Sequence, residues 1–207
     1  MTPRACRKKG AWSLTHLWGA ASNRDGIAAV EFAMLLPFMI TLFFGVVETS
    51  LALLCRADVS IMASTAADLT SQADTLATSD ITNIYNAAGT ILYPYYDPSV
   101  AGSSKPTIRI TSVIYDTVSQ SATVGKVAWT CTQSGSGTLT PSLRTAGSTV
   151  TLPQAMLTSG GSVIVSEIAY NYVSATTKVI AGPINFTNNF YTKPRRIAQI
   201  PAPAGGC

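Results

Sequence analysis

A glycine and a carboxylate stand close together near the amino end of the chain, at Gly26 and Glu31. Cutting the peptide bond after Gly26 would give Ile27 a free α-amino group, and Glu31 would then lie one helical turn along the same face. In a low-dielectric environment this amine and this carboxylate would form an ion pair, either within one chain or between two chains. The opposite charge relieves the free-energy penalty of burying each group. Gly26 has no Cβ, which suits a peptidase that must approach the backbone closely. The spacing thus places Glu31 one turn from the amine that a cut at Gly26–Ile27 would create, where its charge could set the register of docking.

A long apolar run follows the glycine. Residues 27–54 contain only two charged side chains, Glu31 and Glu48. A helix needs about 20 apolar residues to cross a bilayer core, so the run predicts one membrane-spanning helix over residues 27–55. A carboxylate inserted there costs on the order of a few kcal/mol, which favours a functional role for Glu31. Alternatively, Glu31 simply reaches the interface and Gly26 is an ordinary loop glycine. Pro37 removes a helical hydrogen bond, so we expect a helix kink there.

The positive charge of the chain is concentrated before the apolar run. Lys and Arg number 14 against 10 Asp and Glu, and the whole excess of +4 lies within residues 1–26. Basic residues that flank a span stay cytoplasmic, so we expect a cytoplasmic leader over residues 1–26 and the bulk of the chain across the membrane. Nucleic-acid binding would need the basic excess on the folded domain. Residues 27–207 are formally neutral, and no nucleic-acid partner is predicted.

These residues resemble a known family. The stretch GIAAVEFAMLLP at residues 26–37, followed by FFGVVE at residues 43–48, is similar to the TadE/TadG-like domain of tight-adherence (Flp) type IVb pilus systems. That domain typically reads G-x-x-A-V-E-F-A-L-x-x-P before an apolar run that ends in an acidic residue. The resemblance covers about residues 24–67, with looser likenesses to TadE-type members at residues 63–69 and 190–196. The chain departs from many relatives at Asp68, where they carry an arginine.

The resemblance implies a TadE-type pseudopilin, that is, a minor pilin. Such a protein is cut by a prepilin peptidase, here after Gly26, and docks with other pilin subunits at the inner-membrane pilus assembly machinery, here through Glu31 and Phe32. It would be a single-pass protein of the bacterial inner membrane, surrounded by the lipid bilayer, with a cytoplasmic N-terminus and a periplasmic C-terminal domain. A second interpretation is an uncleaved single-pass anchor whose outer sheet domain binds envelope or assembly partners.

The histidine and cysteine content bears on catalysis, metals and disulfides. The only histidine, His16, lies in the leader, so a Ser/His or Cys/His nucleophile pair cannot form beyond the membrane. The four cysteines are scattered, without metal-ligand spacing, and no phosphate-binding glycine loop is present. We therefore expect no enzyme activity, metal or cofactor. Cys131 and Cys207 lie where oxidation is allowed and can form a disulfide, and Glu167 is expected to face solvent.

The periodicity of the remaining residues predicts an α+β fold. A helical seam continues the span to about Leu76, and either packs on other subunits or holds the chain's own sheet. Ser79 or Asp80 is expected to cap a second, short helix that ends near Pro94. Alternation then predicts four strands of a small, mostly antiparallel sheet, at residues 107–116, 122–131, 162–172 and 184–191. The seam residues are Val59, Met62, Ala66, Leu69, Ala73 and Leu76.

The expected organisation follows from these elements. The leader over 1–26 and the span over 27–55 precede an extracytoplasmic helical segment over 56–93. A β-rich extracytoplasmic domain then covers residues 94–200, and residues 201–207 form a flexible tail. Within the β-rich domain, the Gly/Ser/Thr-rich residues 133–148 are predicted to be an exposed loop.

Overall fold

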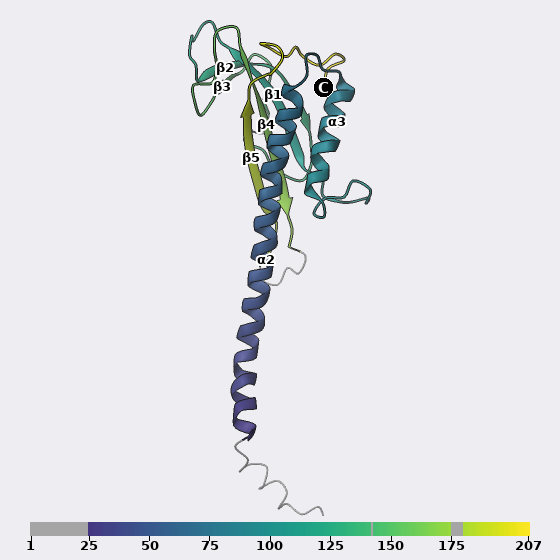
Figure 1. The fold of residues 1–207 in the computed structure, drawn as a ribbon, viewed down its shortest axis with the longest axis vertical. Helices are drawn as coiled ribbons and strands as arrows, with labels where there is room; N and C mark the ends of the chain where they lie inside the picture. The colour runs from purple at the N-terminus through teal and green to yellow at the C-terminus, as the bar shows by residue number, and fades with distance from the viewer. Residues whose placement is uncertain (1–24, 142, 175–179) are drawn as a thin grey trace, which may run out of the picture. The chain divides into compact units, whose positions relative to one another are not determined.

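The computed structural model describes residues 25–141, 143–174 and 180–207, so the predicted leader lies almost wholly outside the described residues. The chain divides into two compact units, Met1–Gly45 and Val46–Cys207. A single helix, α2 (Asp25–Ser71), forms the described part of the first unit and begins the second. The elements that follow are α3 (Thr78–Gly89), the short 3-10 helix η1 (Thr90–Leu92), β1 (Thr107–Tyr115), β2 (Val124–Gln133), β3 (Thr149–Thr151), β4 (Ser162–Tyr172) and β5 (Ile184–Thr192) (Figure 1).

The second unit contains one antiparallel sheet with strand order β3-β2-β1-β4-β5, which confirms the predicted α+β class. Four of its strands fall at the predicted places. The fifth, β3, was missed because its three residues are too few to display an alternating pattern. The central strand β1 pairs with both β2 and β4, so side chains of β1 meet partners from both neighbours.

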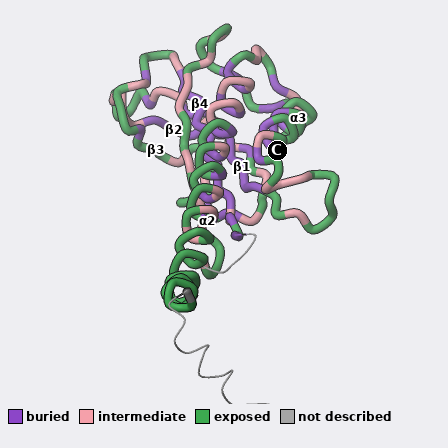
Figure 2. Tube along the Cα trace, turned by 60° about the horizontal axis from the view of Figure 1, so that its bottom comes forward, coloured by how far each residue is buried: buried purple, intermediate pink, exposed green. Residues whose placement is uncertain are grey.

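Both helices of the second unit pack on one face of this sheet. The seam residues Val59, Met62 and Ala66 of α2 are buried, and they share a core with Ile84 of α3 and Ile168 of β4. Figure 2 shows buried segments gathered in the sheet beside α2 and α3. Of the two interpretations of the seam, the structure therefore supports the second, in which it holds the chain's own sheet. Leu69 and Ala73 complete it as partly buried contacts.

The two helix ends differ in detail from the prediction. α2 ends at Ser71 rather than near Leu76, and the Ser71 carbonyl accepts a hydrogen bond from the Arg195 backbone N–H at 2.9 Å instead of from a further helical residue. α3 has Ala77 at its N-cap position, so neither Ser79 nor Asp80 is the cap. Asp80 instead lies in the first turn, where its carboxylate accepts the Ala77 N–H at 2.9 Å.

The other face of the sheet is covered by the glycine-rich segment that was predicted to be an exposed loop. The Thr107 hydroxyl donates to the Gly137 carbonyl at 2.6 Å, the Asn185 amide donates to the Thr138 carbonyl at 2.9 Å, and Leu139 is buried. Glycine permits this close approach, because a Cβ on Gly137 would lie 2.2 Å from the carbonyl carbon of Ala169. Because its glycines have no side chains, the segment can lie directly against the sheet. Its composition alone did not indicate this contact.

Replacing Gly137 with alanine is expected to destabilise the second unit by about 1–3 kcal/mol, because backbone atoms must move to admit the Cβ. The measurement is the urea midpoint of the full chain in detergent micelles, followed by circular dichroism. Ser134→Ala is the matched control, since Ser134 lies three residues away in the same segment and is exposed. A Gly137→Ala midpoint equal to that of the parent would show that the segment does not need this contact.

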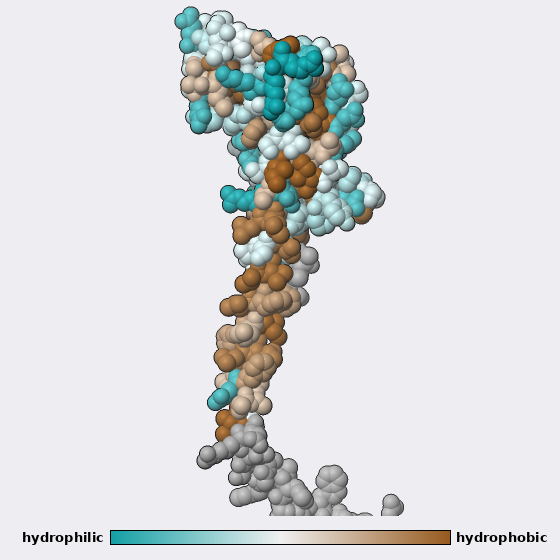
Figure 3. Space-filling model, in the orientation of Figure 1, coloured by the Kyte–Doolittle hydropathy of each residue, from teal (hydrophilic) through white to brown (hydrophobic). Residues whose placement is uncertain are grey.

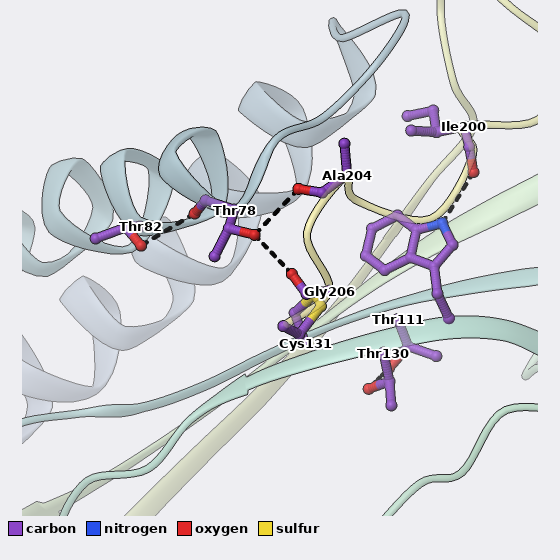
Figure 4. Close-up of a disulfide and its surroundings, with 10 residues drawn as sticks. Thr78, Thr82, Thr111, Thr130, Cys131, Ile200, Ala204 and Gly206 are labelled. Atoms are coloured by element: carbon purple, nitrogen blue, oxygen red, sulfur yellow. Dashed lines mark hydrogen bonds between the residues drawn. A yellow bond between two sulfur atoms is a disulfide. The ribbon is translucent and has the colours of Figure 1, made fainter.

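The carboxyl-terminal residues differ from the flexible tail that was predicted. Ala204 pairs with Ala77 in an isolated bridge, and the Thr78 hydroxyl donates to the Gly206 carbonyl at 2.8 Å. Cys207 is bonded to Cys131 of β2, with Cα atoms 5.2 Å apart, which is the pairing that the sequence left open (Figure 4). Nearby, the Trp129 indole donates to the Ile200 carbonyl at 2.9 Å. These contacts fix the tail against α3 and the sheet.

Candidate functional site

The predicted processing site lies in the first turn of α2. α2 begins at Asp25, and a Cβ placed on Gly26 would meet no atom within 4 Å. The Ile27 side chain on the other side of the bond is 56% exposed. The described part of the chain therefore leaves the Gly26–Ile27 peptide bond uncovered and accessible to another protein.

The predicted docking residues stand one turn further along the same helix. Glu31 and Phe32 are both exposed, and Phe32 leaves 65% of its surface uncovered. Glu31 is one turn from Ile27, the residue that would carry the new amine after cleavage. The helix thus places a carboxylate and a prospective amine on one face, with a large aromatic side chain beside them.

The rest of the first unit is apolar and exposed on all sides. Every described residue from 26 to 44 is exposed, and the large apolar side chains range from 37% exposed at Phe44 to 74% at Phe38 (Figure 3). This stretch is long and apolar enough to cross a membrane. A helix that is apolar all round needs an apolar environment, which a bilayer or neighbouring helices can supply.

Pro37 lies inside this apolar stretch without ending the helix. α2 continues for many residues beyond it, and the Thr41 hydroxyl donates to the Pro37 carbonyl at 2.8 Å. The carbonyl that the proline ring leaves without its helical donor is that of Ala33, so the Thr41 bond is an ordinary side-chain contact within the helix. The kink at Pro37 stays a prediction.

A buried charge cluster lies on the sheet face opposite the helices. Arg109 of β1 stands directly across from Glu167 of β4, and its Nε donates to the Glu167 carboxylate at 2.6 Å. Arg144, from the segment that covers this face, donates to both oxygens of the same carboxylate, at 2.9 and 2.6 Å. Arg109 and Glu167 are each only 1% exposed. The expectation that Glu167 faces solvent is therefore wrong, because the covering segment removes water from its face of the sheet.

Among the carboxyl groups of the second unit with lowered pKa values are Glu167 and Asp116. Burial by itself would raise the pKa of Glu167, but the hydrogen bonds and charges of Arg144 and Arg109 outweigh it and hold this pKa below its usual 4.5. A hydrogen bond from Lys126, at 2.9 Å, is the main cause that lowers the pKa of Asp116 to about 2. Both groups favour the ionised form in the folded state.

The second unit is therefore expected to lose stability in acid. Because the folded pKa of Glu167 is below its unfolded value, the contribution is complete above pH 4.5 and is lost as the pH falls through the folded pKa. The urea midpoint should drop between neutral pH and about pH 3. In a Glu167→Gln variant this part of the pH dependence should disappear. An equally steep drop in that variant would assign the acid sensitivity to other groups.

A second set of ion pairs joins the end of α2 to the carboxyl-terminal segment. Asp68 pairs with Arg195 and Asp74 pairs with Arg196. The Arg195 backbone N–H also donates to the Ser71 carbonyl at 2.9 Å, which satisfies one carbonyl at the helix end. Asp68, the position at which the chain departs from many relatives, thus has an arginine partner in the late stretch of residues 190–196 that also resembled the family. These pairs are surface-exposed and join residues 195 and 196 to the end of α2 and the turn after it.

The comparison with known families agrees with the site just described. Residues 26–68 match the family model described as TadE-like protein, which is consistent with a TadE-like family member. The matched residues include the Gly26 and Glu31 positions and nearly all of α2, but not α3 or the sheet. No curated protein and no solved structure matches the chain. The family likeness is thus carried by the helix.

The structure locates the residues singled out from the sequence in two separate places. Gly26, Ile27, Glu31 and Phe32 lie together at the start of α2, whereas Cys131 and Cys207 meet at the sheet. Sequence reasoning missed the Arg109 side chain. An arginine inside a run of β-branched residues was the available signal, because a charge in a strand that is otherwise apolar is rarely buried without a partner.

Proposed function

We propose that this chain is a pilin-like structural subunit of a tight-adherence pilus assembly system. The observation that carries the proposal is the match of residues 26–68 to the TadE-like family together with the exposed Gly26–Ile27 bond and the exposed Glu31 one turn beyond it. A prepilin peptidase cuts after Gly26. The cut leaves an α-amino group on Ile27 and removes the formal positive excess that residues 1–26 carry.

In this proposal the apolar part of α2 occupies two apolar environments, one after the other. Before assembly it spans the bacterial inner membrane, with the N-terminus cytoplasmic and the second unit periplasmic, as the basic leader favours. During assembly the same exposed side chains pack against helices of other pilin subunits at the inner-membrane assembly machinery. Both environments are apolar, so the move exposes little apolar surface to water.

Glu31 sets the register of docking in this account. A carboxylate in an apolar environment is strongly penalised unless it has a partner. The α-amino group of Ile27 in a neighbouring subunit supplies that partner, and Phe32 adds apolar contact beside it. Because only a cleaved subunit has this amine, cleavage and docking are coupled.

The role of the chain in assembly can be tested in cells of its own host. Deleting its coding region should remove surface pili and surface attachment, and the parent sequence supplied in trans should restore both. A variant with Gly26→Val, in which a branched side chain stands at the proposed cut, is expected not to restore them. Pili at the parental level on the deletion strain would refute a role in assembly.

A further inference from the structure

One loop of the second unit is fixed beside α2 where the apolar run ends. Residues 93–105 connect η1 to β1 and follow the end of α3 (Figure 1). The Tyr95 hydroxyl donates to the Leu51 carbonyl of α2 at 3.0 Å, and the Tyr170 hydroxyl of β4 donates to the Tyr95 carbonyl at 2.8 Å. The Tyr95 and Tyr172 rings also meet edge to face, with centroids 5.7 Å apart. The start of the loop is thus held at the level of Leu51.

A second contact brings the β4–β5 connection to nearly the same level of the helix. The Glu48 carboxylate accepts the Ile180 N–H at 2.7 Å, and Glu48 is only 1% exposed. Glu48 and Leu51 are one helical turn apart. This end of the sheet and the loop over residues 93–105 therefore lie next to the same turn of α2.

That turn falls at the edge of a membrane if α2 spans one. The span predicted over residues 27–55 is too long, because Glu48, Ala52 and Cys55 are buried within the second unit and cannot face lipid. A lipid-facing stretch that starts at Ile27 and uses about 20 residues ends near Val46. The turn from Glu48 to Leu51 then lies in the headgroup region, and so do the loops that bond to it. The opposite end of the sheet, where β1 connects to β2, is the far end of the strands from this turn.

The side chains of the loop suit a headgroup region. Tyr93 is 68% exposed and Val100 is 56% exposed, so both present apolar surface outward. Tyrosines concentrate at membrane–water interfaces, where an apolar ring and a polar hydroxyl find matching surroundings, and this loop region has three, at 93, 95 and 96. Its charges balance, with Asp97 against Lys105. Two backbone hydrogen bonds, from Val100 to Asp97 and from Ser103 to Val100, hold the turn in shape.

We propose that residues 93–105 form an interfacial surface that lies on the phospholipid headgroups of the membrane that α2 spans, with Tyr93 and Val100 entering the interface. This inference rests on the proposed function only in so far as α2 spans a bilayer. The contact would keep the sheet close to the membrane and give the single span a second point of attachment until the subunit leaves the bilayer.

Tryptophan quenching by brominated phospholipids tests the surface on the full chain in lipid nanodiscs. Trp12 and Trp18 are replaced by phenylalanine, and the buried Trp129 stays as a background common to all variants. Val100→Trp reports on the loop. Val118→Trp is the matched control, because Val118 is an exposed valine in the β1–β2 connection at the far end of the sheet. Leu42→Trp reports on the span itself.

We expect lipids brominated near the headgroup to quench most of the fluorescence that the tryptophan at position 100 adds. The fluorescence added by a tryptophan at position 118 should be unaffected. Quenching at position 42 with none at position 100 would overturn the interfacial surface and leave the span intact. Absence of quenching at position 42 would overturn the span, and the surface with it. Equal quenching at positions 100 and 118 would contradict the proposed orientation of the sheet.

Discussion

Pili are expected to be lost when Glu31 is replaced by glutamine, although the variant still inserts into the membrane and is still cut after Gly26. The glutamine keeps the size of the side chain and removes only the charge that meets the Ile27 amine of a neighbouring subunit. An unpaired charge in an apolar interface costs about 3 kcal/mol or more, roughly a hundredfold in association per contact. The measurement is electron microscopy of surface pili, with immunoblots that compare membrane and processed forms.

Two further variants distinguish the effect of the Glu31 charge from the effect of changing any polar side chain of the helix. Glu31→Asp keeps the carboxylate and shortens the side chain, so partial piliation is expected. Thr41→Ala changes a polar residue of the same exposed helix without touching a charge, and should assemble like the parent. Parental piliation in Glu31→Gln would remove Glu31 from the docking step, whereas loss of the cleaved form would show that Glu31 acts on the peptidase instead.

Glu167→Gln is expected to destabilise the second unit by about 3–5 kcal/mol, the largest effect on folding that the structure predicts. The substitution leaves the Arg109 guanidinium buried at 1% exposure without its counter-charge, and Nη2 of Arg109 already has no hydrogen-bond partner among the described residues. It also removes the bidentate partner of Arg144. The urea midpoint of the full chain in detergent micelles measures the loss.

Asp68→Asn is the matched control, because it breaks an ion pair in the same unit that is exposed at both ends, 61% at Arg195 and 40% at Asp68. Exposed pairs contribute about 0–1 kcal/mol, so its midpoint should stay close to that of the parent. Equal losses in the two variants would mean that burial of the Arg109–Glu167 pair adds nothing to stability.

The parts of the fold that depend on local pattern could be predicted from the sequence. The start of α2 and its apolar run could be predicted because the residues that determine them are neighbours in the sequence. The seam at Val59, Met62 and Ala66 predicted a packed helix face, although it could not say whether the partner was the chain's own sheet. Alternation predicted the four longer strands, because each has enough residues to display a period of two.

The parts that depend on distant residues could not be predicted in this way. Glu167 has partners 58 and 23 residues away along the chain, so its burial depends on how the strands pair and on which segment covers them. The covering segment is rich in glycine, which usually indicates an exposed loop, whereas here glycine permits close contact with the sheet. The tail of residues 201–207 is likewise fixed by partners on α3 and β2 that its own composition does not indicate.

The N-terminus of the membrane-extracted chain tests the account most directly, read by intact mass and peptide sequencing from cells with and without the prepilin peptidase. The account predicts a chain that begins at Ile27 when the peptidase is present and at Met1 when it is absent. A chain that begins at Met1 in both would contradict a processed pilin-like subunit, and would favour an uncleaved anchor whose sheet domain binds a partner.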